Sequence, residues 1–177
     1  MPFIFFPSPL GGLPPLLPFH FFVKNLIIDN GITTIGTQAF RGMNKIKTAT
    51  IPNSVTSIGE RAFHTCTSLT DIIIPNLVTS IKDYAFSSCT SLTNIIIPNS
   101  VTSIGLGVFF NCNQLTNVEF LGIIEPSYEC SSDGCPFDWC YGLTNSKCPM
   151  TSRTIKVPSN YDSAKSTFCR IPVSRQS

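Results

Sequence analysis

The sequence has little charge. Charged residues make up 12% of its 177 residues, about half the share that is usual for a soluble protein. The net charge is +2, and between positions 28 and 120 five basic residues balance five acidic ones. A protein that follows a phosphate backbone needs a basic patch or stripe, and this chain has none. We therefore expect no nucleic-acid partner.

Residues that carry enzymatic chemistry are also scarce. His20 and His64 are the two histidines, and the sequence has no P-loop, dinucleotide fingerprint or serine-nucleophile elbow. The repeat described below assigns Cys66 to the interior. It assigns His64 to an exterior position that also holds Arg41, Ser87 and Phe110, so a Cys–His nucleophile is not predicted. These absences predict a protein that is not an enzyme and has no cofactor.

Long apolar runs are missing too, since none approaches the roughly eighteen residues that span a bilayer. Residues 1–22 are apolar but contain six of the fourteen prolines, and they lack the basic start and cleavage site of a signal peptide. Proline breaks helices, and this segment does not share the repeat that follows. We interpret it as an irregular cap, a disordered tail or the non-native start of a truncated repeat array.

What the sequence does contain is a 23-residue repeat. Four units follow head to tail from Ile28, Ile51, Ile74 and Ile97, and the central two are identical at 16 of 23 positions. A period of about 20 to 29 residues with recurring leucine and isoleucine is typical of leucine-rich-repeat solenoids, in which each unit forms one coil. The predicted fold is a β-rich solenoid of stacked coils over residues 23–120.

Aligned units show which positions face the interior, because an inward residue meets the same neighbour in every coil. Six columns are apolar throughout, so each coil is expected to bury about six apolar side chains. These columns are Ile28/Ile51/Ile74/Ile97/Phe120, Ile32/Val55/Val78/Val101, Ile35/Ile58/Ile81/Ile104, Phe40/Phe63/Phe86/Phe109, Ile46/Leu69/Leu92/Leu115 and Ala49/Ile72/Ile95/Val118.

The segment Leu69–Ile74 is predicted to be a strand that pairs with its equivalents about 4.8 Å away in one continuous parallel sheet. Pro75 ends it, because proline cannot donate to a strand ladder. Within the outward positions, Ile73 and Ile96 are the one pair of adjacent aliphatic residues, either a binding patch or ordinary exposed β-propensity. The predicted partner-binding residues are Thr48, Thr50, Asp71, Ile73, Asn94, Ile96, Asn117 and Glu119.

Three cysteines, Cys66, Cys89 and Cys112, share one repeat position, at which the first unit has Met43. A disulfide or a metal site would not readily accept methionine, whereas a buried apolar slot would. We therefore expect three thiols packed in the core.

The other five cysteines lie towards the C-terminal end. Their spacing does not match the C-x2-C pairs of structural zinc, so disulfides are candidates and a metal site is not predicted. Five is odd, which leaves at least one thiol unpaired or intermolecular, and the connectivity stays open. These candidate disulfide residues are Cys130, Cys135, Cys140, Cys148 and Cys169.

The same region retains the repeat in altered form. Phe137 and Cys140 repeat the step from Phe63 to Cys66, and the sequence TIKVP places Ile155 and Val157 in inward columns. Residues 121–177 are thus predicted to be an expanded fifth coil that caps the solenoid. At the other end, the first coil exposes an unpaired strand unless residues 1–22 cover it, so end-to-end self-association is a further hypothesis.

The unit IPNSVTSIGERAFHTCTSLTDI resembles the BspA-like subclass of leucine-rich repeats, which occurs in surface antigens of anaerobic bacteria and parasitic protists. The resemblance covers Val23 to about Val118, and the tail TIKVPSNYDSAKSTFCRIPV resembles the closing segment of protist members. Family members are implicated in adhesion to host cells and extracellular proteins, in co-aggregation and in immune recognition. The resemblance brings no catalytic residues.

The resemblance implies a surface or secreted protein that binds host-cell or extracellular-matrix proteins. An adhesin-like surface antigen is the leading hypothesis. The chain lacks a clear signal peptide and the membrane-spanning tail of many protist relatives, so a cytoplasmic scaffold for protein–protein interaction is the alternative. A truncated paralogue without independent function is the third. The ligand and the oligomeric state leave no motif in the sequence.

Overall fold

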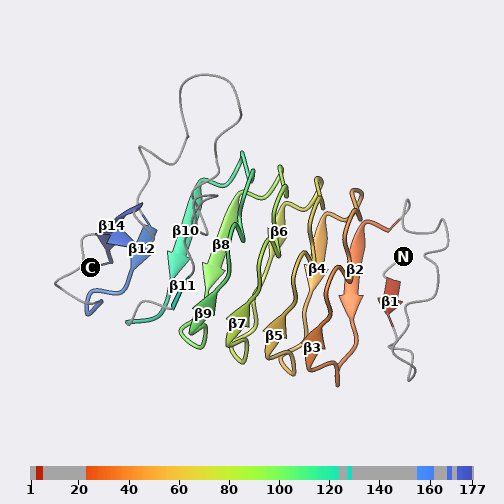
Figure 1. The fold of residues 1–177 in the computed structure, drawn as a ribbon, viewed down its shortest axis with the longest axis horizontal. Helices are drawn as coiled ribbons and strands as arrows, with labels where there is room; N and C mark the ends of the chain where they lie inside the picture. The colour runs from red at the N-terminus through yellow and green to blue at the C-terminus, as the bar shows by residue number, and fades with distance from the viewer. Residues whose placement is uncertain are drawn as a thin grey trace.

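The computed structural model describes residues 3–5, 23–123, 127–128, 155–161, 167–168 and 171–176. Within these ranges the chain winds into a solenoid of stacked coils without a helix (Figure 1). Neighbouring strands pair residues 23 positions apart, such as Thr48 with Asp71 and Asn94 with Asn117. The predicted β-solenoid with 23-residue coils is therefore confirmed.

Parallel strands line one side of the solenoid, which we call the first face. Its strands are β2 (Asn25–Ile28), β4 (Thr48–Thr50), β6 (Asp71–Ile72), β8 (Asn94–Ile97), β10 (Asn117–Phe120) and β12 (Ile155–Val157). At its ends, β1 (Phe3–Phe5) pairs with β2 and β14 (Ile171–Arg175) pairs with β12, while β13 (Thr167–Phe168) lies antiparallel to β14.

A second side, the second face, carries a sheet that the sequence did not predict. Its strands are β3 (Thr34–Ile35), β5 (Ser57–Ile58), β7 (Ser80–Ile81), β9 (Ser103–Ile104) and β11 (Ser127–Tyr128), in the order β11-β9-β7-β5-β3. The parallel pairing predicted for the first face is confirmed, and this second sheet was missed. Each of these strands has two residues, so the alternation that reveals a strand has no room to repeat.

The first-face strands are also shorter than predicted. β6 begins at Asp71 rather than Leu69, whose N–H donates to the carbonyl of Cys66 at 3.0 Å in a turn. β6 and β8 lie side by side (Figure 1) but belong to separate sheets, β1-β2-β4-β6 and β13-β14-β12-β10-β8. At this seam the Thr93 N–H meets the Thr70 carbonyl at 3.5 Å, against 2.9 Å for the equivalent bond one coil later.

The predicted inward columns form most of the core, and they are buried throughout except at Ile32. Ile32 is partly buried and packs against the core. The phenylalanine rings of successive coils stack face to face, with centroids 5.1, 5.4 and 5.7 Å apart from Phe40 to Phe109. This continuous aromatic stack runs through the centre of the molecule and packs successive coils against one another.

Threonine side chains stitch neighbouring coils together on the outside. The hydroxyl of Thr79 donates to the carbonyl of Thr56 at 3.3 Å, and Thr102 repeats this bond to Thr79 at 3.2 Å. A second threonine column bonds in the same way beside the first face, where Thr70 donates to Lys47. Threonine hydroxyls that bond from one coil to the next can thus supply the polar surface of a chain that has few charged residues.

The third side of each coil, the turn side, joins neighbours through backbone bonds such as Phe63 N–H to the Ala85 carbonyl at 2.8 Å. Six non-glycine residues there have positive φ, namely Gln38, Arg61, Thr65, Tyr84, Ser88 and Asn111. Gly107 takes the position of Tyr84 one coil later, and a Cβ at Gly107 would lie 2.6 Å from the Tyr84 ring. Glycine leaves room there for the aromatic ring.

At the N-terminal end, residues 3–5 are not irregular as predicted but form β1 beside β2, with Phe3 opposite Leu26. Residues 3–6 are a proline-free stretch between Pro2 and Pro7, so their backbone can donate to a ladder. β1 therefore covers the edge of β2 at which end-to-end association was expected. The remainder of residues 1–22 lies outside the described residues.

At the C-terminal end, β12 pairs with β10 so that Lys156 stands opposite Glu119. This register places Val157 in the inward column of Phe120, where the alignment of the tail had put it, and Val157 is buried. Tyr161 is buried as well and meets the Phe120 ring edge-on, with centroids 6.2 Å apart. Phe137 and the five C-terminal cysteines lie outside the described residues, so the domain boundaries at 22 and 120 stay predictions.

Candidate functional site

The predicted binding residues form two straight columns on the first face. Asp71 pairs with Thr48, and Asn94 pairs with Asn117, in the column nearer the start of the strands. The second column includes Ile96 opposite Glu119. Because parallel strands in register align identical repeat positions, the structure brings all eight side chains onto one surface.

Ile73 and Ile96 are the exposed aliphatic residues among the eight predicted positions of that surface. Ile73 is 74% exposed and Ile96 is 48% exposed. Both sit at the seam between β6 and β8, where the sheet hydrogen bonding is interrupted. Contiguous exposed apolar patches mark contact surfaces, and this pair is a candidate for the centre of one.

Polar neighbours on the same face are held by side-chain hydrogen bonds. Thr48 donates to Asn25 at 3.0 Å, and Asn94 donates to Thr93 at 3.0 Å. Glu119 accepts a bond from Gln176 at 2.8 Å, and it is half-buried like Asn117. Asn117 and Glu119 are thus less accessible to a partner than the other predicted residues. The accessible centre of the face lies over β4, β6 and β8.

Sequence reasoning missed three members of these columns. Asn25 pairs with Thr48 and Ile27 pairs with Thr50, while Lys156 extends the second column past Glu119. The signal was present, because NLII at residues 25–28 matches NIII at 94–97. Residues 25–27 precede Ile28, the first residue of the first complete repeat unit.

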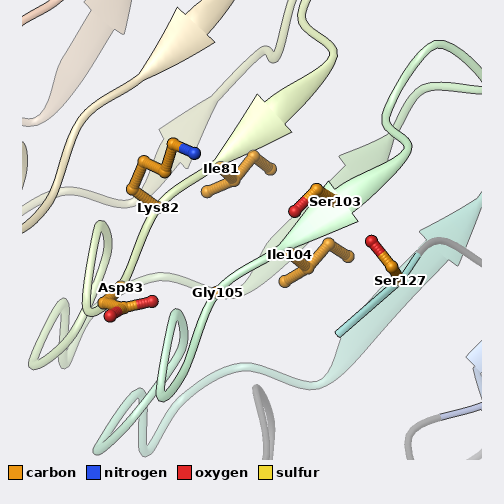
Figure 2. Close-up of a pocket in the computed structure, with 7 residues that line it drawn as sticks. All are labelled: Ile81, Lys82, Asp83, Ser103, Ile104, Gly105 and Ser127. Atoms are coloured by element: carbon orange, nitrogen blue, oxygen red, sulfur yellow. The ribbon is translucent and has the colours of Figure 1, made fainter. Parts of the chain in front are cut away.

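A shallow hollow of about 200 Å³ lies on the second face between the coils of β7, β9 and β11 (Figure 2). Its polar lining comes from Lys82, Asp83, Ser103 and Ser127. Asp83 already accepts the Leu106 N–H at 2.9 Å, and Ser127 donates to the Thr102 carbonyl at 3.0 Å. The hydrogen bonds of Asp83 and Ser127 thus join neighbouring coils around the hollow.

The three repeat cysteines are buried thiols, as predicted. The Sγ atoms of Cys66, Cys89 and Cys112 donate to the carbonyls of phenylalanines 26 residues earlier at 3.1 to 3.3 Å. Burial raises the pKa of Cys66 from 9.0 to about 12 and the pKa of Cys89 well above 9.0. Thiols that stay protonated are poor nucleophiles and poor metal ligands.

We expect these thiols to resist modification in the native protein. At about pH 8, iodoacetamide should leave Cys66 and Cys89 unmodified in folded protein and should modify both after unfolding in denaturant, because the reactive thiolate is absent from the core. Mass spectrometry of the peptides that contain Cys66 and Cys89 measures the ratio of modified to unmodified thiol in each state. Modification at equal rates in the two states would show that the cysteine column is accessible.

The same pKa shifts predict how stability depends on pH. The unfolded thiols ionise above their ordinary pKa near 9 while the folded thiols keep their protons. The stabilisation is therefore complete below that value and is lost as pH rises towards about 12. Urea unfolding of the native chain and of Cys66→Ala/Cys89→Ala between neutral and alkaline pH should show a smaller alkaline loss in the variant.

The repeat position of His64 is only partly exterior, which corrects the sequence interpretation. Arg41 is exposed and His64 and Phe110 are half-buried, but Ser87 is just 1% exposed. A small side chain at this position is covered by the turns of neighbouring coils, whereas longer ones extend past them.

The sequence of residues 20–136 matches the model of the BspA type leucine rich repeat region, in six copies. No significant match was found among curated protein sequences. Among solved structures, the chain is similar to the leucine-rich repeat protein of T. pallidum, with a TM-score of 0.59 and 26% identity, covering 76% of this chain and 58% of that one.

Two further bacterial structures are similar. A leucine-rich cell surface protein of Faecalibacterium prausnitzii has a TM-score of 0.55 and 32% identity, covering 58% of this chain and 28% of that one. A leucine-rich repeat protein of Bacteroides ovatus has a TM-score of 0.52 and 29% identity, covering 60% and 30%. The chain thus spans less than two thirds of the length of each of these proteins.

Among the described residues there is no helix of the length and apolarity needed to cross a bilayer. The buried columns, the register of 23 residues and the match over residues 20–136 agree with one another. The chain belongs to the BspA-type leucine-rich-repeat family, whose repeats form a protein-interaction fold.

Proposed function

We propose that this chain is a protein-binding module that engages its partner through the first face, as an adhesin-like surface antigen. The observation that carries the proposal is the exposure of Ile73 and Ile96 at the centre of that face. Burying one isoleucine side chain against a partner contributes about 1.5–3 kcal/mol. Two adjacent ones can therefore form the apolar centre of an interface, with the Thr, Asn and Asp side chains as its polar rim.

The rigidity of the face supports the same proposal. The backbone of each coil is tied to its neighbours on three sides, and Thr48 and Asn94 are already held by side-chain hydrogen bonds. A surface that is ordered before binding loses little conformational entropy on association. Modest contacts spread over several coils can then give useful affinity.

The test is a double substitution, Ile73→Lys/Ile96→Lys. Host-cell surface and extracellular-matrix proteins are first screened against the immobilised chain by surface plasmon resonance. For any binder found, the variant should lose about 100-fold in affinity, because burial of two isoleucines is replaced by burial of two charges. Stability should change little, since both positions are exposed.

The matched control is Asn76→Lys/Asn99→Lys, which adds the same two charges one coil apart at exposed positions in the turns that follow β6 and β8. Binding that survives the control but not the first-face variant supports the proposal. Equal loss in both variants would mean that added charge alone weakens binding. Unchanged binding in Ile73→Lys/Ile96→Lys would remove the first face as the interface.

The cellular part of the proposal has a separate test. An antibody against the chain should label intact cells, because an adhesin must be displayed outside the cell. The Faecalibacterium protein to which this chain is similar is described as a cell surface protein. Labelling only after permeabilisation would contradict surface display and favour the scaffold hypothesis.

A further inference from the structure

A cluster of three basic side chains lies on the turn side of the first two coils, away from both sheets. Arg41 and His64 occupy the same repeat position one coil apart. The backbones are joined there, since the Gly42 N–H donates to the His64 carbonyl at 2.8 Å and the His64 N–H donates to the Arg61 carbonyl at 3.1 Å. We call Arg41, Arg61 and His64 the basic cluster.

The electrostatic surroundings of His64 are positive. Burial lowers the pKa of His64, the charge of Arg41 lowers it further and the charge of Arg61 does the same, while a backbone hydrogen bond with Ser87 acts in the opposite direction. The neighbour on the next coil, Ser87, is uncharged. The imidazole therefore lies near two cations, one of which is paired with Glu60.

One atom of the imidazole ring also lacks a partner. Nδ1 of His64 is buried and has no hydrogen-bond partner in the described part of the chain. A buried polar atom without a partner costs free energy. Protonation of the ring makes both nitrogens donors, but a ligand oxygen can reach Nδ1 only after the ring has rotated.

The two guanidinium groups are positioned by contacts that use few of their donors. Arg41 donates to the side chain of Gln38 at 3.0 Å. Arg61 forms an ion pair with Glu60 and lies over the Tyr84 ring, 5.3 Å from its centroid. Each guanidinium has five N–H donors in a fork that matches an oxyanion. Glu60 offsets one positive charge, which leaves a net positive cluster.

We propose that Arg41, Arg61 and His64 form a binding site for an oxyanion, that is, a carboxylate, phosphate or sulfate group. The two guanidinium groups supply charge-assisted hydrogen bonds, and protonated His64 adds a third positive charge. An anion bound between them raises the affinity of the ring for its proton. By reciprocity, the anion binds more tightly as His64 becomes protonated. This site is independent of the first face.

The test follows the His64 ring by NMR in the full chain, titrated with acid in sulfate and in chloride of equal ionic strength. The spectrum of His20→Gln assigns the two histidine signals. Sulfate should raise the pKa of His64 by about one unit more than chloride does, which corresponds to about tenfold tighter binding to the protonated ring. Equal shifts in the two salts would mean screening of Arg41 and Arg61 only, and would overturn the site.

Variants locate the effect. Arg41→Gln, at an exposed position that contacts Gln38, should reduce the sulfate-specific shift, and Arg41→Gln/Arg61→Gln should abolish it. Lys45→Gln removes one exposed cation from the same coil and should leave the shift intact. A shift that persists in the double variant, or that disappears in Lys45→Gln as well, contradicts the proposal. Acetate and inorganic phosphate at the same ionic strength then distinguish which oxyanion class the site prefers.

Discussion

Replacement of Phe86 by alanine is expected to lower the free energy of unfolding by about 3–5 kcal/mol, the usual cost of truncating a fully buried phenylalanine. Phe86 is completely buried and stacks on Phe63 at 5.4 Å and on Phe109 at 5.7 Å. Its removal interrupts the aromatic stack at mid-solenoid and leaves a cavity that rigid neighbouring coils cannot fill. Urea unfolding followed by circular dichroism measures the loss.

The control for this substitution is Phe110→Ala, one coil later on the turn side. Phe110 is half-buried and meets Tyr84 edge-on at 6.3 Å. Its truncation should cost clearly less, because much of the ring is in contact with water already. A loss at Phe86 no larger than the loss at Phe110 would show that the stack does not contribute as proposed. Broadening of the Phe86→Ala transition would indicate that the two halves of the solenoid unfold separately.

A pair of glycines in one column should respond in opposite ways to the same added methyl group. A Cβ at Gly59 would lie 2.7 Å from backbone atoms of Ile35 and Gly36, whereas a Cβ at Gly36 meets nothing within 4 Å. Gly59→Ala must therefore push two coils apart and weaken the 2.8 Å bond from its own N–H to the Ile35 carbonyl. We expect a loss of about 1–3 kcal/mol, the range for overpacked sites.

Gly36→Ala should be neutral or stabilise the protein by up to about 1 kcal/mol, because it restricts the unfolded chain without a clash. Thermal unfolding of the two variants side by side gives the comparison. Lys82 occupies the same column one coil after Gly59, so another coil of this protein accommodates a side chain at this repeat position. Equal stability of the two alanine variants would mean that the coils separate at no cost here.

The buried interior could be derived from the sequence because a solenoid repeats one environment. Val55, Val78 and Val101 occupy one repeat position and are all buried. A repeat position that keeps an apolar residue in every coil therefore indicates a buried site. The same logic placed Cys89 in the core through its alignment with Met43, and it placed Val157 in the column of Phe120 across an insertion. The same register predicted that eight outward residues lie on one surface.

Tertiary structure decided what the repeat cannot encode. The two-residue strands of the second face depend on hydrogen bonds between coils, and a strand such as Ser80–Ile81 is too short to show a period of its own. The pairing of Phe3–Phe5 with β2 depends on an edge that exists only after the first coil has folded. The accessibility of Glu119 depends on its contact with Gln176, which lies 57 residues later in the chain. Columns follow from local periodicity, whereas edges, seams and ends depend on contacts between segments that the periodicity does not relate.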